Sequence, residues 1–239
     1  MGNILTITGR ELRSYFFSPL AYILTGVFAF FMGFVFYNNI LGTSTADLSN
    51  TFSLMWVIAI ILTPALTMRL FAEENRMGTI ELLMTAPVRD WQIVIGKYIA
   101  GLIGYIALLI PTLWFIVILW RYGPPDYGMI LAGYVGILLG GAAFVAVGML
   151  TSSLTGNQVI AFFLGFLVLL FLWFAGIPSG VTGAAGNPLT DFLTYISLPS
   201  NFQDFFSGVI DGARALYFVS LAAIAVFLTV RVVESRRWS

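Results

Sequence analysis

The chain has 239 residues, of which 59% are hydrophobic and 9% charged, and its 11 basic and 11 acidic residues give a net charge of zero. A mean hydropathy of +0.96 does not fit a water-soluble domain of this length. Histidine and cysteine are absent from the sequence, which excludes disulfides, metal sites built on thiolates or imidazoles, and nucleophilic catalysis by either residue. The zero net charge gives no indication of a nucleic-acid partner.

Residues 1–18 precede the first long apolar stretch and have the pattern of an amphipathic helix. At 100° per residue the apolar side chains share one arc and the basic side chains lie opposite, although Ile7 spoils the separation. The apolar arc holds Ile4, Leu5, Leu12, Tyr15 and Phe16. We predict an interfacial helix lying on the membrane. An ordinary cytosolic lead-in to the first span is the alternative.

Long apolar runs occupy most of the remaining chain. About 20 apolar residues in a helix cross a hydrocarbon core of about 30 Å, and a helix satisfies its own backbone hydrogen bonds there. We therefore predict an all-α polytopic membrane protein with six transmembrane helices in one domain, residues 1–239. The expected spans are about 19–41, 52–71, 91–120, 129–150, 159–177 and 216–233.

The connection from 178 to 214 differs from the others. It is rich in glycine, proline, serine and asparagine, yet it contains the apolar run 192–198 and the pair Phe205-Phe206. Short re-entrant helices that dip into the outer leaflet fit this composition, provided that protein covers their irregular backbone. An extracytoplasmic cap with a small core of its own is the alternative.

The distribution of Lys and Arg predicts the orientation. With the N-terminus inside, only Arg121 and Arg214 fall outside, and both termini are cytoplasmic. The predicted cytoplasmic basic residues are Arg10, Arg13, Arg69, Arg76, Arg89, Lys97, Arg231, Arg236 and Arg237. Those near span ends can extend their charged heads to the interface. Mid-membrane charges are absent from this arrangement, which argues against a proton-coupled carrier.

A crowded polar segment at 72–89 lies between the second and third predicted spans. If residues 73–85 form one helix, an acidic face carries Glu74, Gly78, Glu81 and Thr85, and the opposite face carries Met77, Ile80, Leu83 and Met84. This segment is predicted to be a cytoplasmic helix whose acidic face meets a partner. A solvated turn joining two spans is the alternative.

The string from Glu74 to Val88, ENRMGTIELLMTAPV, closely resembles the cytoplasmic signature of ABC-2 type permeases, the membrane subunits of a class of ABC transporters. The strings FQDFFSGVID at 202–211 and RVVESRRW at 231–238 are similar to the gliding-motility-associated branch of that family. The resemblance implies an exporter made of two permease copies or paralogues in the cell inner membrane, with P-loop ATPase subunits bound below. It also implies an ATPase-coupling interface at Glu73, Glu74, Arg76, Gly78, Thr79, Glu81, Leu82 and Thr85, with Met77, Ile80 and Met84 anchoring the helix.

The sequence has no G-x-x-x-x-G-K-[ST] motif, since the Gly96-Lys97 pair lacks the upstream glycine and the hydroxyl residue. The chain is therefore predicted to bind no cofactor or metal and not to be an enzyme, with ATP and Mg²⁺ on a separate ATPase subunit. A channel or assembly scaffold that docks a non-ATPase cytosolic protein is the alternative function. A membrane-embedded enzyme is disfavoured, because the spans contain no paired acids.

The fourth predicted span carries small residues at helical spacing, and Gly136, Gly140 and Gly148 share one face. Such faces allow helices to approach closely. The sequence leaves open whether this contact forms within the chain or between two copies.

Overall fold

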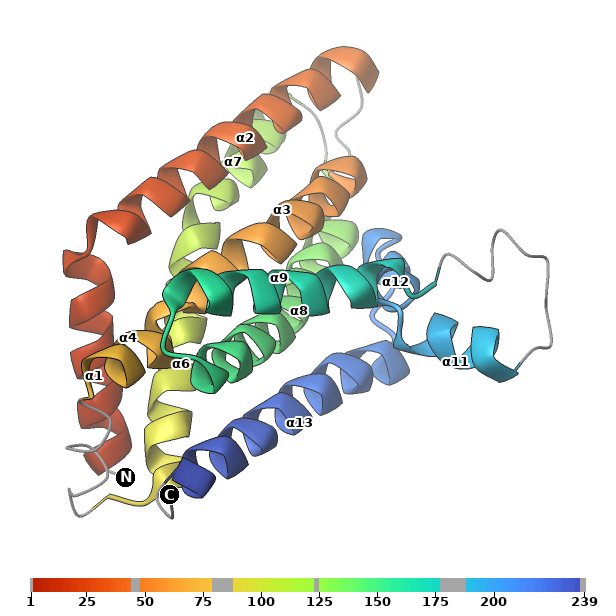
Figure 1. Cartoon of the computed structure of the whole chain (residues 1–239). Coiled ribbons are helices and arrows are strands. Elements are labelled where there is room, and N and C mark those ends of the chain that lie inside the picture. Colours follow the sequence, from red (N-terminus) through yellow and green to blue (C-terminus); the bar gives the residue numbers. More distant parts are fainter. Residues whose placement is uncertain (1, 44–47, 79–87, 123–124, 177–187, 237–239) are drawn as a thin grey trace.

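The computed structural model describes residues 2–43, 48–78, 88–122, 125–176 and 188–236, and this part of the chain is all-helical (Figure 1). In chain order the elements are α1 (Gly2–Phe17), α2 (Pro19–Thr43), α3 (Ser49–Thr67), α4 (Arg69–Met77), α6 (Asp90–Leu109), the 3₁₀ turn η1 (Ile110–Thr112), α7 (Leu113–Tyr122), α8 (Tyr127–Leu154), α9 (Gln158–Phe174), α11 (Pro188–Ile196), α12 (Leu198–Phe206) and α13 (Gly212–Arg236).

Five segments of the described chain are long and apolar enough to cross a membrane: Pro19–Leu41, Ser49–Met77, Asp90–Arg121, Tyr127–Leu154 and Gly212–Ser235. They correspond to five of the six predicted spans. The other prediction, 159–177, falls on α9, which is apolar but has 17 residues. At 1.5 Å per residue such a helix is about 26 Å long, a little short of the hydrocarbon core. The six-span count is therefore not confirmed.

Helix α8 lies at the centre of the fold and packs against α3, α6, α9, α12 and α13. Its glycines make these contacts possible, since a Cβ at Gly140 or Gly141 would overlap the rings of Trp56 or Tyr105. Likewise, Gly136 faces Phe202 and Phe205, and Gly148 faces Thr67. The predicted glycine face thus packs within the chain, which answers the question that the sequence left open.

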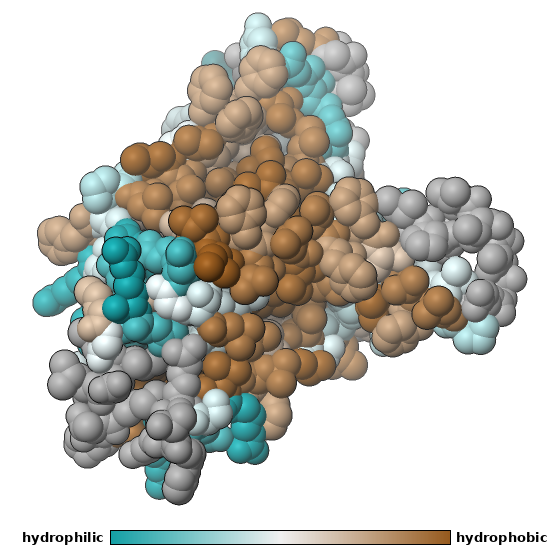
Figure 2. Space-filling view, in the orientation of Figure 1, coloured by the Kyte–Doolittle hydropathy of each residue, from teal (hydrophilic) through white to brown (hydrophobic). Residues whose placement is uncertain are grey.

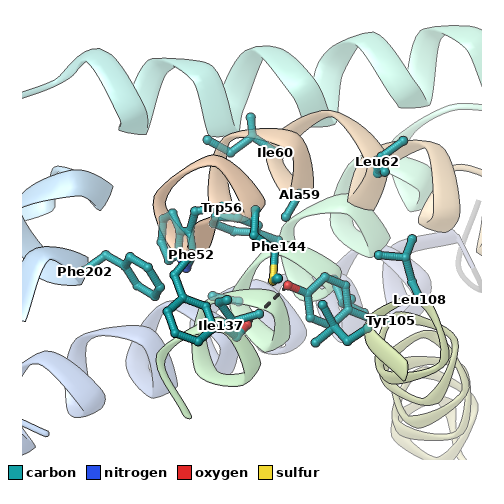
Figure 3. Packing of buried hydrophobic residues seen from close by; sticks show 14 of the residues in the cluster. Phe52, Trp56, Ala59, Ile60, Leu62, Tyr105, Leu108, Ile137, Phe144 and Phe202 are labelled. Carbon is teal, nitrogen blue, oxygen red and sulfur yellow. Dashed lines mark hydrogen bonds between the residues drawn. The ribbon is translucent and has the colours of Figure 1, made fainter. Parts of the chain in front are cut away.

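The main core is a group of aromatic side chains where α3, α8, α12 and α13 meet. Trp56 lies 3.9 Å from Phe202 and 4.8 Å from Phe144 between ring centroids. Figure 3 shows these rings together, with the Tyr105 hydroxyl pointing to the backbone of α8, where it donates to the Ile137 carbonyl. This core joins α3, through Trp56, to the short helix α12.

Helix α1 packs on α6, and the residue that spoiled the predicted amphipathic arc makes this contact. Ile7 is buried against Gly96, and the Thr8 hydroxyl donates to the Gly96 carbonyl. Leu5, on the arc predicted to face the membrane, is 71% exposed. Helix α1 is thus seated by protein contacts through Ile7 and Thr8, and its position on a membrane stays a prediction.

The chain turns sharply between α1 and α2 at Ser18. The Ser18 hydroxyl accepts from the backbone N–H of Leu20, and Pro19 is the first residue of α2. Serine before a helix and proline at its first position are both favoured, because they use the N–H groups that the helix leaves unpaired. The first long apolar helix accordingly begins where the sequence predicted.

Helices α11 and α12 lie at the end of α13 opposite the C-terminus (Figure 1). Arg214 at the start of α13 donates to Asp204 and Asn201, which belong to α12. Residues 178–187 of the predicted re-entrant segment lie outside the described residues. The described helices are short, but their depth in a membrane stays a prediction.

The N- and C-terminal ends of the described chain lie at the same end of the molecule (Figure 1). Figure 2 shows a broad hydrophobic surface across the long helices, with hydrophilic residues gathered at the end where α1 and α4 lie. Helix α4, which holds the described start of the predicted polar segment, is thus at the boundary of the apolar surface, on the side of both termini.

Candidate functional site

The predicted polar segment begins with α4, which nearly continues α3. Pro64 lies inside α3, and the N–H of Met68 bonds to the Pro64 carbonyl at the break between the two helices. Ser152 on α8 completes the junction, because its hydroxyl donates to the Met68 carbonyl and accepts from the N–H groups of Phe71 and Ala72. One buried serine therefore satisfies three backbone groups that the helix break exposes.

A second side chain supports the same junction from α6. Lys97 is 1% exposed, and its ammonium donates to the Leu70 carbonyl at 2.6 Å and to Glu11 at 3.0 Å. It also lies 5.1 Å from the ring centroid of Phe71. A buried lysine needs such partners, because removing an ammonium from water is costly.

Glu74 of α4 joins this group. Its Oε2 lies 3.0 Å from the Lys97 ammonium, an ion-pair contact outside hydrogen-bond geometry, and its Oε1 accepts from Arg10 at 2.8 Å. Arg10 also donates to Glu11. We call Arg10, Glu11, Glu74 and Lys97 the ionic cluster. It contains two cations and two carboxylates, and it ties α4 to α1 and α6.

The ionic cluster stabilises the charged form of the Arg10 guanidinium. Burial by itself lowers the pKa of the Arg10 guanidinium, but the hydrogen bonds and charges of Glu11 and Glu74 outweigh this effect and raise the pKa overall. Tyr15, one turn further along α1, donates to the Leu66 carbonyl, and burial raises the pKa of its phenol. The phenol therefore stays a neutral donor that fixes α1 to the end of α3.

Apolar contacts complete the seat of α4. Leu70 and Phe71 are fully buried in a small cluster with Ile7 of α1 and Met149 of α8, and Val88 packs against it. The α8–α9 connection also touches the end of α4: the Asn75 amide donates to the Thr155 carbonyl at 3.1 Å. Helix α4 is thus held on three sides, by α1, α6 and α8.

The structure places the predicted docking residues differently from the sequence. The single helix expected over 73–85 is wrong, because α4 ends at Met77 and Gly78 adopts a left-handed conformation with φ of 69°. A glycine at this position ends helices because it lacks a Cβ. Residues 79–87, which include Thr79, Ile80, Glu81, Leu82, Met84 and Thr85, lie outside the described residues.

Of the described residues, Glu74 departs from its predicted face, whereas Glu73 pairs as predicted. The Glu74 side chain, expected to face the cytosol, is 14% exposed in the ionic cluster. Met77, expected to anchor the helix, is 60% exposed. Glu73 faces Arg69, whose Nε lies 3.2 Å from Glu73 Oε2, as the i, i+4 spacing predicts. The outward end of α4 consists of Arg76, Met77 and Gly78.

Sequence reasoning missed Ser152 and the inward role of Lys97. A single lysine within the predicted third span was interpreted as an end residue whose head reaches the interface, but the structure buries it. The signal that could have found it is the unusual position of one cation in an apolar helix, which calls for a carboxylate on a neighbouring element. Ser152 carries no such signal, because its partners are backbone groups at a helix break.

Together these features define an integral membrane protein with a polar helix, α4, seated rigidly at one end of its apolar helices. A sequence model of the ABC-2 family transporter proteins matches residues 5–234, so the chain belongs to this family of multi-pass membrane transport proteins. The chain is 33% identical over 135 residues to a protein named "Probable multidrug ABC transporter permease YbhR" in Escherichia coli K12, and equally to that of strain O157:H7. These matches cover 56% of this chain and 35% of the relatives.

Proposed function

We propose that the chain is the permease subunit of an ATP-driven ABC-2 exporter, with ATP and Mg²⁺ bound by a separate P-loop ATPase subunit. The observation that carries the proposal is the seat of α4. A helix that nearly continues a membrane span, and whose outer end presents Arg76 and Met77, is suited to receive a partner and to move with the span.

The contacts at the α3–α4 junction support a mechanical role. Ser152 and Lys97 bond the backbone at the break, so a force on α4 is transmitted to α3 and α8 together. Helix α3 carries Trp56 into the aromatic core, which contacts α12 at the other end of the molecule. Closure of two ATPase subunits would therefore shift packing on both sides of the membrane.

Residues 72–89 form the coupling segment in this proposal, with α4 as its rigid base. Thr79, Glu81, Leu82 and Thr85 are the proposed contacts beyond Gly78, and Ile80 and Met84 the proposed anchors. Electrostatic complementarity is the main part expected of Glu81, because charges at an interface set orientation and reject wrong partners.

The topology proposed here extends the prediction from the sequence. Both termini are cytoplasmic, the protein lies in the cell inner membrane, and α9 makes the sixth crossing with the help of residues after Phe174. The segment 178–214 lies on the outer side as a re-entrant or capping element. A second copy or a paralogue completes a dimer, and the resemblance at 202–211 and 231–238 favours the gliding-motility-associated branch.

The test is a charge reversal, Glu81→Lys, in the complex purified from its native membrane through a tagged chain. We expect a P-loop ATPase to co-purify, and the variant to lower its association or its stimulated ATP hydrolysis about tenfold, since one reversed interface charge costs more than 1.4 kcal/mol. Arg231→Gln, on the exposed end of α13, is the matched control and should change neither quantity.

Two results would refute the proposal. Purification of the intact chain with a cytosolic partner that binds no ATP would favour the channel or scaffold function. Unchanged association and hydrolysis in Glu81→Lys would remove the coupling segment from the mechanism.

A further inference from the structure

A pocket of about 360 Å³ opens between α1, α2, α3, α4 and α6 at the level where the chain enters its first span. Its volume falls within the range of roughly 300–1,000 Å³ that is typical of small-molecule sites. The pocket lies beside the ionic cluster, but the proposed docking end of α4 contributes only Met77 to its wall. Coupling to an ATPase therefore leaves this pocket unexplained.

The walls of the pocket divide into an apolar half and a charged half. Leu20 and Leu24 of α2 and Leu66 of α3 form the apolar half. Arg69 and Glu73 of α4 stand on the charged half. Because the first long apolar segment begins at Pro19, we expect the apolar half at the hydrocarbon boundary and the charged half among headgroups. An apolar half next to a charged half matches the polarity of an amphiphilic ligand.

Outside the ionic cluster, the charged half offers one cation beside one anion, whereas Arg10 is already bonded to Glu11 and Glu74. The side chains of Arg69 and Glu73 are 35% and 36% exposed, respectively, and Arg69 also donates to the Ser18 hydroxyl at 2.7 Å. The lining as a whole includes three basic and three acidic residues: Arg10, Arg69, Lys97, Glu11, Glu73 and Glu74. Such a balanced site suits a zwitterion, whose two charges each meet an opposite charge.

We propose that this pocket binds an ethanolamine phospholipid of the adjacent leaflet, with its phosphate on Arg69 and its ammonium on Glu73. A guanidinium pairs with phosphate in a fork of two hydrogen bonds, and a carboxylate accepts from a primary ammonium. The acyl chains leave between α2 and α3 along Leu24 and Leu66. The lipid fills the space under the α1–α2 turn and holds α1 against α4.

Two competing headgroups fit less well. Anionic lipids are recognised by clusters of basic residues, whereas Glu73 here would repel a second negative charge. Choline carries no N–H donor and is bound by aromatic cages, but Tyr15 is the single aromatic side chain among the described residues that line the pocket, and one ring does not make a cage. The site therefore distinguishes ethanolamine from both glycerol and choline headgroups.

The experiment uses the full chain, purified in detergent and stripped of lipid. Phosphatidylethanolamine, phosphatidylcholine and phosphatidylglycerol with identical acyl chains are added in turn, and bound lipid is counted by native mass spectrometry while thermal unfolding is followed. We expect one phosphatidylethanolamine per chain, bound about tenfold more tightly than the other two, because its ammonium pairs with Glu73 and the other two headgroups offer no N–H donor.

Variants test the assignment of each charge. Arg69→Gln should weaken phosphatidylethanolamine binding about tenfold, and Glu73→Gln should reverse the preference in favour of phosphatidylglycerol, since it leaves the site positive. Leu24→Trp fills the apolar half and should exclude all three lipids while the charged half stays intact. Arg231→Gln, whose guanidinium pairs with Glu234 away from the pocket, is the control and should bind as the wild type does.

Equal binding of the three lipids would overturn the proposal, as would unchanged selectivity in Glu73→Gln. These readouts need no ATPase and no cargo. Failure here therefore leaves the proposed exporter function standing, and failure of ATPase coupling leaves the lipid site standing.

Discussion

Replacing Lys97 by methionine tests how firmly α4 is seated. Methionine keeps the unbranched apolar stem over Phe71, so packing changes little, but it removes the ammonium. The Leu70 carbonyl then loses its donor, and Glu11 and Glu74 lose the cation between them. The variant thus isolates the electrostatic part of the contact between α4, α1 and α6.

The expected loss of unfolding free energy is about 3 kcal/mol. Removing one partner of a buried ion pair typically costs 3–5 kcal/mol, because a charge is left without compensation. The lower end applies here, since the Glu11 and Glu74 side chains keep 13% and 14% exposure and Arg10 remains bonded to both. Glu74→Gln alone should cost about 1 kcal/mol, because Lys97 retains Glu11 and the Leu70 carbonyl.

A double-mutant cycle separates this interaction from general damage. Unfolding by SDS in mixed micelles, followed by tryptophan fluorescence, gives the free energies of the two single variants and of Lys97→Met with Glu74→Gln. We expect a coupling energy of about 2 kcal/mol, since neutralising Glu74 relieves the charge that the first change left unpaired. The exposed pair Arg231–Glu234 serves as the control cycle and should give less than about 0.5 kcal/mol.

Additive single effects in the Lys97–Glu74 cycle would refute the reasoning. They would mean that the two groups do not meet in the membrane, and that α4 is held by its apolar contacts alone.

Two further predictions concern packing and the helix junction. Gly141→Ala should destabilise the protein by about 1–3 kcal/mol, because its Cβ would overlap Tyr105. Gly33→Ala on α2, with open space around it, should be neutral or stabilising by up to about 1 kcal/mol. Thermal unfolding compares the two variants, and equal losses of stability would contradict the packing of α8. Ser152→Ala should lower the free energy of unfolding by about 1–3 kcal/mol and increase amide hydrogen exchange at Phe71, because two buried N–H groups lose their acceptor. Ser220→Ala removes an exposed hydroxyl that bonds within α13, and it should change neither quantity.

The long helices were predictable because hydrophobicity and length dominate their formation. Proline at position 19 favours the start of a helix, and the glycines of α8 allow neighbouring helices to approach closely. The start of α2 and the close packing of α8 were therefore predictable from the sequence. The glycine face could not be assigned to one chain or two, because that depends on which aromatic rings fold against it. The folded structure shows that Trp56 and Tyr105 of the same chain pack against these glycines.

The polar segment shows what sequence periodicity cannot supply. A helical wheel places Glu74 on an outward face, but the buried charge of Lys97, 23 positions away, draws it inward. The helical wheel also assumes one continuous helix past Gly78, but the left-handed backbone at Gly78 ends α4 there. These differences arise from a tertiary ion pair and from a glycine that adopts the left-handed conformation, and helical periodicity contains neither.

In the proposed function the outer end of α4 meets an ATPase, and the absence of cysteine from the sequence makes a direct measurement of this contact possible. Arg76→Cys introduces a single thiol at that end, and a bifunctional reagent of short reach can then link it to the co-purified P-loop subunit. We predict one cross-linked product in the complex, with a yield that changes on addition of ATP, and none from Tyr37→Cys at the far end of α2. A stable complex that gives no product from position 76, or equal product from position 37, would contradict the account.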